Sequence, residues 1–383
     1  MSQKEKFKNK LLELKVNSGN HSPSIATLYS EIPNFEIKID ACFLSNPYAT
    51  ELFLDHLDKD LLKSGNIRNV LEFYPPQNRQ VAKFISKLAE VESKNIFVGN
   101  GAIEIIQAVL QRFVLKKLCV IIPTFSSYYE FVRPDTEIIY FELDKEEDYS
   151  LNSERLIRFV KENDIDSLVI INPNNPNGAY LDSKEILIIV EELRFLHCLI
   201  IDESFIHFAY ESIDLNQISS EKLISEYANL VVIKSMSKDF GIAGIRAGYA
   251  VMSSKRVDEL LNNGYLWNIS GLADYFFRLY SDIEFMKAYE VVRKKYIMNT
   301  LMFMNQIKSL PHIKLYPSKA NFVLLELCNS SSFDFSIDLL FDHGVYVRDC
   351  SDKIGLNGQF VRVASRTFEE NLGVISAMKT ILG

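Results

Sequence analysis

The chain has 383 residues, of which 48% are hydrophobic, and this length predicts a globular protein with two domains. Its formal net charge is -8 at pH 7 and its lysines and arginines are spread along the chain, so we expect no nucleic-acid partner. The first fifteen residues mix charged and apolar side chains without an uninterrupted apolar core, which predicts neither a signal peptide nor a membrane anchor but a cytoplasmic protein. The five cysteines form no C-x-x-C pair, and we expect no metal site.

Between about residues 95 and 250, short β-rich runs alternate with segments of helical period. This alternation predicts a parallel sheet covered by helices. The expected strands are residues 96–98, 118–122, 168–171, 198–201 and 230–233, and a polar or glycine-bearing turn follows each of them. Because ligands bind at the carboxyl ends of parallel strands, we expect these five turns to line one site.

The first of these turns leads into a helix. Apolar residues recur at helical spacing from Ala102 to Phe113, so Gly99 to Gly101 form the entry to an amphipathic helix. A helix N-terminus offers free N–H groups and a positive potential, which suit a phosphate group.

The pattern of expected helices and strands changes after Gly271. Long helical patterns cover residues 274–310, and β-like stretches around residues 321–327, 344–349 and 360–366 precede a final helix. This pattern predicts a second, smaller α+β domain. We therefore expect an N-terminal segment at 1–50 that packs with the small domain or a partner subunit, a large domain at 51–270 and a small domain at 271–383.

Three polar positions at expected strand ends stand out together. Lys238 lies in SMSKDFGIAGIRAGY, Asp202 in IIDESF and Asn175 in NPNNPNG. Each has an ordinary explanation alone, as a surface lysine, a helix cap and a turn. Together they match the needs of pyridoxal 5′-phosphate, which requires an amine for a Schiff base, a carboxylate for its ring nitrogen and a cup for its phosphate.

These motifs, from FYPPQN through FVRVASR, resemble fold-type I pyridoxal-phosphate enzymes of the class I/II aminotransferase family. Within that family the chain is similar to histidinol-phosphate aminotransferases and threonine-phosphate decarboxylases. The resemblance implies an aspartate aminotransferase-like α/β fold, with a large cofactor-binding domain built on a mostly parallel seven-stranded sheet and a smaller α+β domain.

The resemblance also implies roles for residues of the large domain. Lys238 is expected to be the Schiff-base lysine and proton shuttle, Asp202 the partner of the pyridine nitrogen and Asn175 the partner of the phenolic oxygen. Phe125 is expected to stack on the cofactor ring. The expected phosphate ligands are Gly101, Ala102, Ile103, Ser235, Ser237 and Arg246.

Two further roles concern the partner subunit and the substrate. Tyr74 is expected to reach the cofactor phosphate of a neighbouring subunit, which implies a homodimer. Arg362 is expected to bind the substrate carboxylate, since a guanidinium can form two parallel hydrogen bonds with it. Arg366 and Asn321 are candidates for the lining of a pocket for the substrate's phosphate.

The reaction type is less fixed than the cofactor. Aminotransferases of this group usually carry tyrosine where this chain has Phe205, and phenylalanine there, with Arg366, is a feature of threonine-phosphate decarboxylases. We expect an aminotransferase acting on a small phosphorylated or phosphonate amino compound. The alternatives are a decarboxylase of phosphothreonine or phosphoserine and, outside catalysis, a ligand-binding regulator.

Overall fold

The computed structural model describes residues 2–33 and 35–383, whose contacts group them into two compact units. Unit 1 comprises the chain up to Leu44, Pro176–Gly178 and Ile297–Gly383. Unit 2 comprises Ser45–Asn175 and Ala179–Tyr296. In the described residues no helix is both long and apolar enough to cross a membrane.

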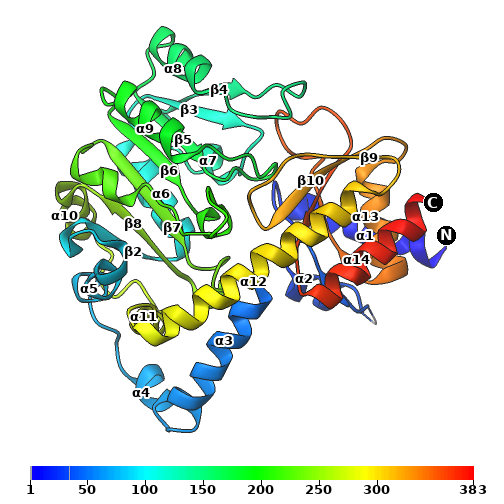
Figure 1. The fold of residues 1–383 in the computed structure, drawn as a ribbon, viewed down its shortest axis with the longest axis horizontal. Coiled ribbons are helices and arrows are strands. Elements are labelled where there is room, and N and C mark those ends of the chain that lie inside the picture. The colour runs from blue at the N-terminus through cyan, green and yellow to red at the C-terminus, as the bar shows by residue number, and fades with distance from the viewer. Residues whose placement is uncertain (1, 34) are drawn as a thin grey trace. The chain divides into compact units, whose positions relative to one another are not determined.

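Unit 2 is built on a seven-stranded sheet, which confirms the expected fold class (Figure 1). The strand order is β2 (Ile96–Asn100), β8 (Ala247–Met252), β7 (Leu230–Ser235), β6 (Cys198–Asp202), β5 (Ser167–Ile171), β3 (Lys117–Ile122), β4 (Glu137–Glu142). The five strands from β7 to β4 are mutually parallel, and β8 pairs antiparallel with both β7 and β2. The sequence prediction located five of these strands and did not include β4 and β8.

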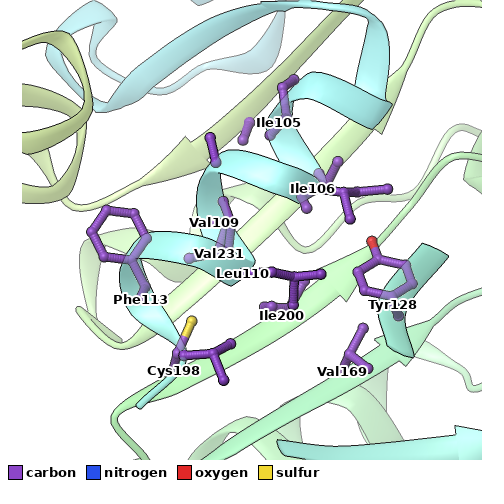
Figure 2. Packing of buried hydrophobic residues seen from close by; sticks show 14 of the residues in the cluster. Ile105, Ile106, Val109, Leu110, Phe113, Tyr128, Val169, Cys198, Ile200 and Val231 are labelled. Atoms are coloured by element: carbon purple, nitrogen blue, oxygen red, sulfur yellow. The ribbon is translucent and has the colours of Figure 1, made fainter. Parts of the chain in front are cut away.

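Both faces of this sheet are buried, as expected for parallel strands that read as continuous apolar runs. One face packs against α6 (Gly101–Phe113), whose Leu110 and Phe113 belong to the same apolar cluster as Val169 and Ile200 of the sheet (Figure 2). Side chains alternate along each strand, so the next residue after Ile200, Ile201, points to the other face of the sheet and is also buried. The sheet is therefore a fixed platform for the loops at its edge.

The remaining helices of unit 2 follow from apolar periodicity and end signals in the sequence. For example, Asp182 and Glu185 form a capping box at the start of α9. These helices are α3 (Pro47–Leu57), α4 (Ile67–Glu72), α5 (Asn78–Ala89), α7 (Ser127–Glu130), α8 (Ser153–Glu162), α9 (Ser183–Glu192), α10 (Ser254–Asn262) and α11 (Gly271–Tyr280). The long helix α12 (Ile283–Lys308) runs from unit 2 into unit 1.

Unit 1 has the α+β composition expected of the small domain. Its four-stranded antiparallel sheet has the order β12 (Arg348–Asp349), β13 (Phe360–Ala364), β10 (Phe322–Leu327), β9 (Ile313–Leu315). The short strands β1 (Ile39–Asp40) and β11 (Val345–Tyr346) pair in parallel. The helices are α1 (Gln3–Asn17), α2 (Ile25–Glu31), α13 (Ser332–His343) and α14 (Phe368–Leu382), and α1 packs through Phe7 and Leu11 against residues of α13.

Candidate active site

The strand register of unit 2 brings the expected phosphate ligands together. Ser235 at the end of β7 pairs with Gly248, which in turn pairs with Gly99 of β2. One residue further along, Asn100 pairs with Ala247, the residue directly after Arg246. Three segments far apart in the sequence therefore meet at one edge of the sheet.

Arg246 lies against the N-terminus of α6. Gly101 has a φ of +76°, and a Cβ placed there would lie 2.3 Å from the Nη2 atom of Arg246. Gly248 is equally constrained, since a Cβ there would lie 2.8 Å from the backbone nitrogen of Ala102. The guanidinium thus lies against the first residue of the helix, and cation and helix dipole favour an anion near this place. This cradle fits the phosphate of the cofactor.

Asp202 ends β6 and carries a carboxylate that is almost entirely buried. Its Oδ2 accepts a hydrogen bond from the hydroxyl of Tyr128 at 2.8 Å, and its Oδ1 accepts one from the backbone N–H of Ser204 at 2.8 Å. Burial raises the pKa of Asp202, and both hydrogen bonds oppose that rise. A buried anion of this kind needs a cation, and the protonated ring nitrogen of pyridoxal phosphate is one.

Tyr128 was missing from the sequence prediction. The stretch PTFSSYY offers several aromatic rings, and Phe125 was the one assigned to the cofactor. The structure packs Phe125 at the border of the unit 2 core, whereas Tyr128 is fully buried within that core (Figure 2). The Tyr128 hydroxyl is the group that donates to Asp202. The residue spacing gave no sign of this bond.

The loop that carries Asn175 is fixed by its neighbours. Asn172 donates to the carbonyl of Leu181 at 2.9 Å and accepts from the N–H of the same residue at 2.9 Å. Asn174 donates to the carbonyl of Pro123 at 3.0 Å. Asn175 directly follows these anchored positions and is buried. The turn motif therefore holds Asn175 in a fixed loop after β5, and its role toward the cofactor stays a prediction.

Lys238 follows β7 in a loop that is held on both sides. Its carbonyl oxygen accepts a hydrogen bond from the N–H of Asn46 at 2.8 Å. The next residue, Asp239, lies with its Oδ2 2.5 Å from Nδ1 of the buried His207. Lys238 itself is half-buried. The backbone from which the amine extends is thus anchored to two other segments of unit 2.

Two other predicted positions differ in exposure. Phe205 is buried beside the end of β6 and has no hydroxyl to offer the cofactor. Tyr74 is 83% exposed, and its ring lies 5.4 Å from the ring of Trp267. Among the described residues, the Tyr74 ring is thus largely open to solvent, and its role toward a second subunit stays a prediction.

In unit 1, Arg362 has an arginine directly opposite it. Arg348 of β12 pairs with Arg362 of β13 in the antiparallel register, so both side chains leave the same face of the sheet. Arg362 donates to the carbonyl of Cys42 at 2.9 Å, and Arg348 donates to the carbonyl of Asn20 at 3.0 Å. Arg348 was not among the predicted site residues, because the register of two strands cannot be read from their sequences.

A third cation, Lys353, joins this pair. Its Nζ donates to the same Asn20 carbonyl at 3.3 Å, and Asp352 lies 2.5 Å from Arg348 but 3.9 Å from Lys353. Burial, and then the charge of Arg348, lower the pKa of the Lys353 amine to about 8. We call Arg348, Lys353 and Arg362 the cation cluster of unit 1. It holds three buried cations around one carboxylate.

The other predicted substrate residues have different neighbours. Arg366 lies 3.6 Å from Glu370 at the start of α14. Asn321 is buried and donates to the carbonyl of Leu44 at 3.0 Å. Both remain predictions as substrate ligands, and the structure adds Arg348 and Lys353 as neighbours of Arg362.

Comparison with known proteins places this site in a family. Residues 48–372 match the model of the aminotransferase class I and II family. The chain belongs to that family. Its cofactor is pyridoxal 5′-phosphate, as the cradle at α6 and the buried Asp202 carboxylate independently suggest.

Two relatives in this family correct the expected reaction. The chain is 52% identical to the L-serine phosphate decarboxylase of Campylobacter jejuni, over 96% of this chain and 95% of the relative. It is 47% identical to the L-serine phosphate decarboxylase of Sulfurospirillum multivorans, over 96% and 94% of the two chains. A solved structure of a decarboxylase from Sulfurospirillum multivorans superposes with a TM-score of 0.95 at 45% identity, covering 99% of this chain and 97% of the other.

The prediction of an aminotransferase is therefore wrong, and the decarboxylase alternative has the support. The physical reason for the error is that both reactions use the same lysine, aspartate and phosphate cradle. Those shared residues make up most of the sequence motifs, whereas a feature that could separate the reactions, such as Phe205, is a single position within them.

We expect Tyr128→Phe to weaken cofactor binding about tenfold, because the loss of one hydrogen bond to the buried Asp202 carboxylate disfavours its charged form. Titration of the variant with pyridoxal phosphate, followed by its visible absorbance band, measures this change. Tyr140→Phe on the edge strand β4 is the matched control and should bind like the wild type. Unchanged affinity in Tyr128→Phe would show that this hydroxyl does not support the site.

Lys353 should also make the stability of the ligand-free protein depend on pH. Its pKa is about 8 in the folded chain against an ordinary 10.5 in the unfolded chain. Between these pH values the unfolded chain binds more protons than the folded chain, so the contribution of Lys353 to the free energy of unfolding rises with pH. The destabilisation caused by the buried, protonated amine is fully present below pH 8.

We therefore expect Lys353→Met to be more stable than the wild type at pH 7 by on the order of 1–3 kcal/mol, and this advantage to vanish by about pH 10.5. Melting temperatures measured in phosphate-free buffers between pH 7 and 10.5 test this. Lys314→Met removes an exposed lysine of the same unit and should show no such trend. A stability difference that is constant with pH would contradict the assignment.

Proposed function

We propose that this protein is a pyridoxal-phosphate-dependent decarboxylase that converts O-phospho-L-serine to O-phosphoethanolamine and carbon dioxide. The observation that carries the proposal is the identity of 52% and 47% to two L-serine phosphate decarboxylases over nearly the whole chain. The cation cluster of unit 1 supports it, since a substrate with a carboxylate and a phosphate is strongly anionic.

Different residues of the chain would bind the cofactor and transfer protons. When bound, the cofactor supplies an electron sink for the bond that breaks. Lys238 provides the amine that holds the cofactor and later a proton at the substrate carbon. Asp202, supported by Tyr128, keeps a proton on the ring nitrogen. Arg246 and the N-terminus of α6 hold the cofactor phosphate.

The substrate's anionic groups set the outcome. The cations that hold the substrate would fix its orientation and would thereby choose between loss of a proton and loss of carbon dioxide at the α-carbon. We propose that Arg362 and Arg348, which leave the same face of one sheet, are among these cations. Phe205 removes the hydroxyl that aminotransferases of the group usually present beside the cofactor.

Supplying O-phospho-L-serine to the purified holoenzyme should release one carbon dioxide for each O-phosphoethanolamine formed, and the visible band of the enzyme should persist through many turnovers. Lys238→Ala should lower the rate by at least about a thousandfold, since it removes the amine that takes part in each proton transfer. L-serine is the control substrate and should react far more slowly. If the visible band is instead lost in one turnover without carbon dioxide release, the enzyme does not decarboxylate this compound.

We also propose that the protein is a homodimer. Exposed apolar residues gather around Tyr74 in unit 2, namely Leu71, Phe73, Leu266 and Trp267. A solvent-exposed group of this kind favours an interface with another chain. It is consistent with the expectation that Tyr74 serves the neighbouring subunit.

Sedimentation equilibrium should therefore give twice the mass of one chain. Phe73→Glu combined with Trp267→Glu should shift the protein toward monomer, because two buried charges would face each other across the interface. Leu187→Glu, on the exposed side of α9, is the control and should leave the mass unchanged. A wild-type protein that sediments as a monomer at micromolar concentration would overturn this proposal.

A further inference from the structure

The charges of the cation cluster of unit 1 do not balance. Arg348, Lys353 and Arg362 are each at most 9% exposed, and Asp352 is the carboxylate among them. The next acidic group, Asp349, is already paired with Lys15 of α1. The cluster thus carries a net charge of about +2 away from water, which is costly unless an anion joins it.

The carboxylate of Asp352 lies 3.9 Å from the Lys353 amine, a long distance for an ion pair. Asp352 lies closer to Arg348, at 2.5 Å, and the Lys353 amine donates a hydrogen bond to the neutral carbonyl of Asn20 at 3.3 Å. A turn fixes the lysine in place, since its N–H donates to the carbonyl of Cys350 at 3.0 Å. An ammonium group held in this way is poised for an incoming anion rather than for another residue of the chain.

A phosphate monoester matches this charge better than a carboxylate. Its second pKa is about 6, so it carries two negative charges above neutral pH and three oxygen acceptors. A carboxylate would neutralise only one of the two excess charges. The compact ammonium of lysine binds phosphate as a point charge, whereas the guanidinium groups favour paired hydrogen bonds.

We infer that Lys353 is the residue that recognises the doubly charged phosphate of the substrate and thereby sets the preference for phosphorylated over unphosphorylated amino acids. The identity of that substrate rests on the proposed decarboxylase function. Lys353 then acts as a specificity residue, and it takes no part in the bond-breaking step.

The surroundings of Lys353 make this role dependent on pH. The charged or titratable groups that face it are Arg348, Arg362, Asp352 and the thiol of Cys350, with Lys15 behind Asp352. Burial raises the pKa of the Cys350 thiol, and the guanidinium groups stay charged. With a pKa of about 8, Lys353 is the group of this set that changes charge just above neutral pH, while the substrate phosphate stays doubly charged.

The test compares wild type, Lys353→Met, Lys353→Arg and the exposed control Lys314→Met as holoenzymes in phosphate-free buffer. For O-phospho-L-serine at pH 7.5, Lys353→Met should raise KM about tenfold or more and leave kcat within about twofold. Lys353→Arg and Lys314→Met should keep KM near the wild-type value. The KM of the wild type should rise by up to about tenfold per pH unit above pH 8, and that of Lys353→Arg should not, because its guanidinium stays charged.

A second readout separates this inference from the proposed function. Inorganic phosphate should raise the melting temperature of the wild-type holoenzyme, and this protection should be lost in Lys353→Met but kept in Lys353→Arg. If the wild type releases no carbon dioxide from O-phospho-L-serine yet shows this Lys353-dependent protection, the proposed function fails and the phosphate site stands. If carbon dioxide is released while KM and protection are unchanged in Lys353→Met, or if Lys353→Arg shows the wild-type pH profile, the inference about Lys353 is overturned.

Discussion

The pairing register of the unit 2 sheet is the constraint on which the cofactor site depends. Residues 99, 235 and 248 are neighbours only because β8 runs antiparallel between β2 and β7. This arrangement turns the loop before β8 back onto the start of α6, so that Arg246 meets Gly101. A shift of β8 by one residue would turn its side chains to the other face of the sheet and break this cradle. The apolar packing on both faces therefore fixes the chemistry at the edge.

Each of the two units contains buried charge that the chain itself does not fully neutralise, and the sign of that charge differs between the units. In unit 2 the buried Asp202 carboxylate has two neutral hydrogen-bond donors, and in unit 1 three cations share one carboxylate. Neither arrangement is at its most favourable in the chain alone, because buried charge that is not neutralised costs free energy. On the proposed function, each would be completed by a ligand of opposite sign, a protonated ring nitrogen in one unit and an anionic substrate in the other. A buried charge that lacks a counter-charge before binding favours the ligand that supplies one, and it disfavours a similar ligand that does not.

Sequence reasoning recovered the elements whose chemistry is local. The parallel strands, the helix after Gly101 and the motifs around Lys238 and Asp202 each carry their signal within about fifteen residues. It missed β8 because its apolar run follows directly on the phosphate-binding motif and reads as part of the loop. Tyr128 and Arg348 were missed for a different reason. Both act through partners 74 and 14 residues away in the chain, and only the folded register brings those partners together.

The reaction type lies beyond what these local motifs encode. Transamination and decarboxylation need the same amine, the same carboxylate and the same phosphate cradle, and they differ in which bond of the substrate stands perpendicular to the conjugated plane. That angle depends on how several cations share the carboxylate and the phosphate of one small molecule. Arg362 alone could orient a carboxylate for either reaction, and we propose that the neighbouring Arg348 and Lys353 add a second place for the doubly charged group. The identity of an enzyme on this scaffold therefore depends less on the residues that touch the cofactor than on the distribution of positive charge that holds the substrate.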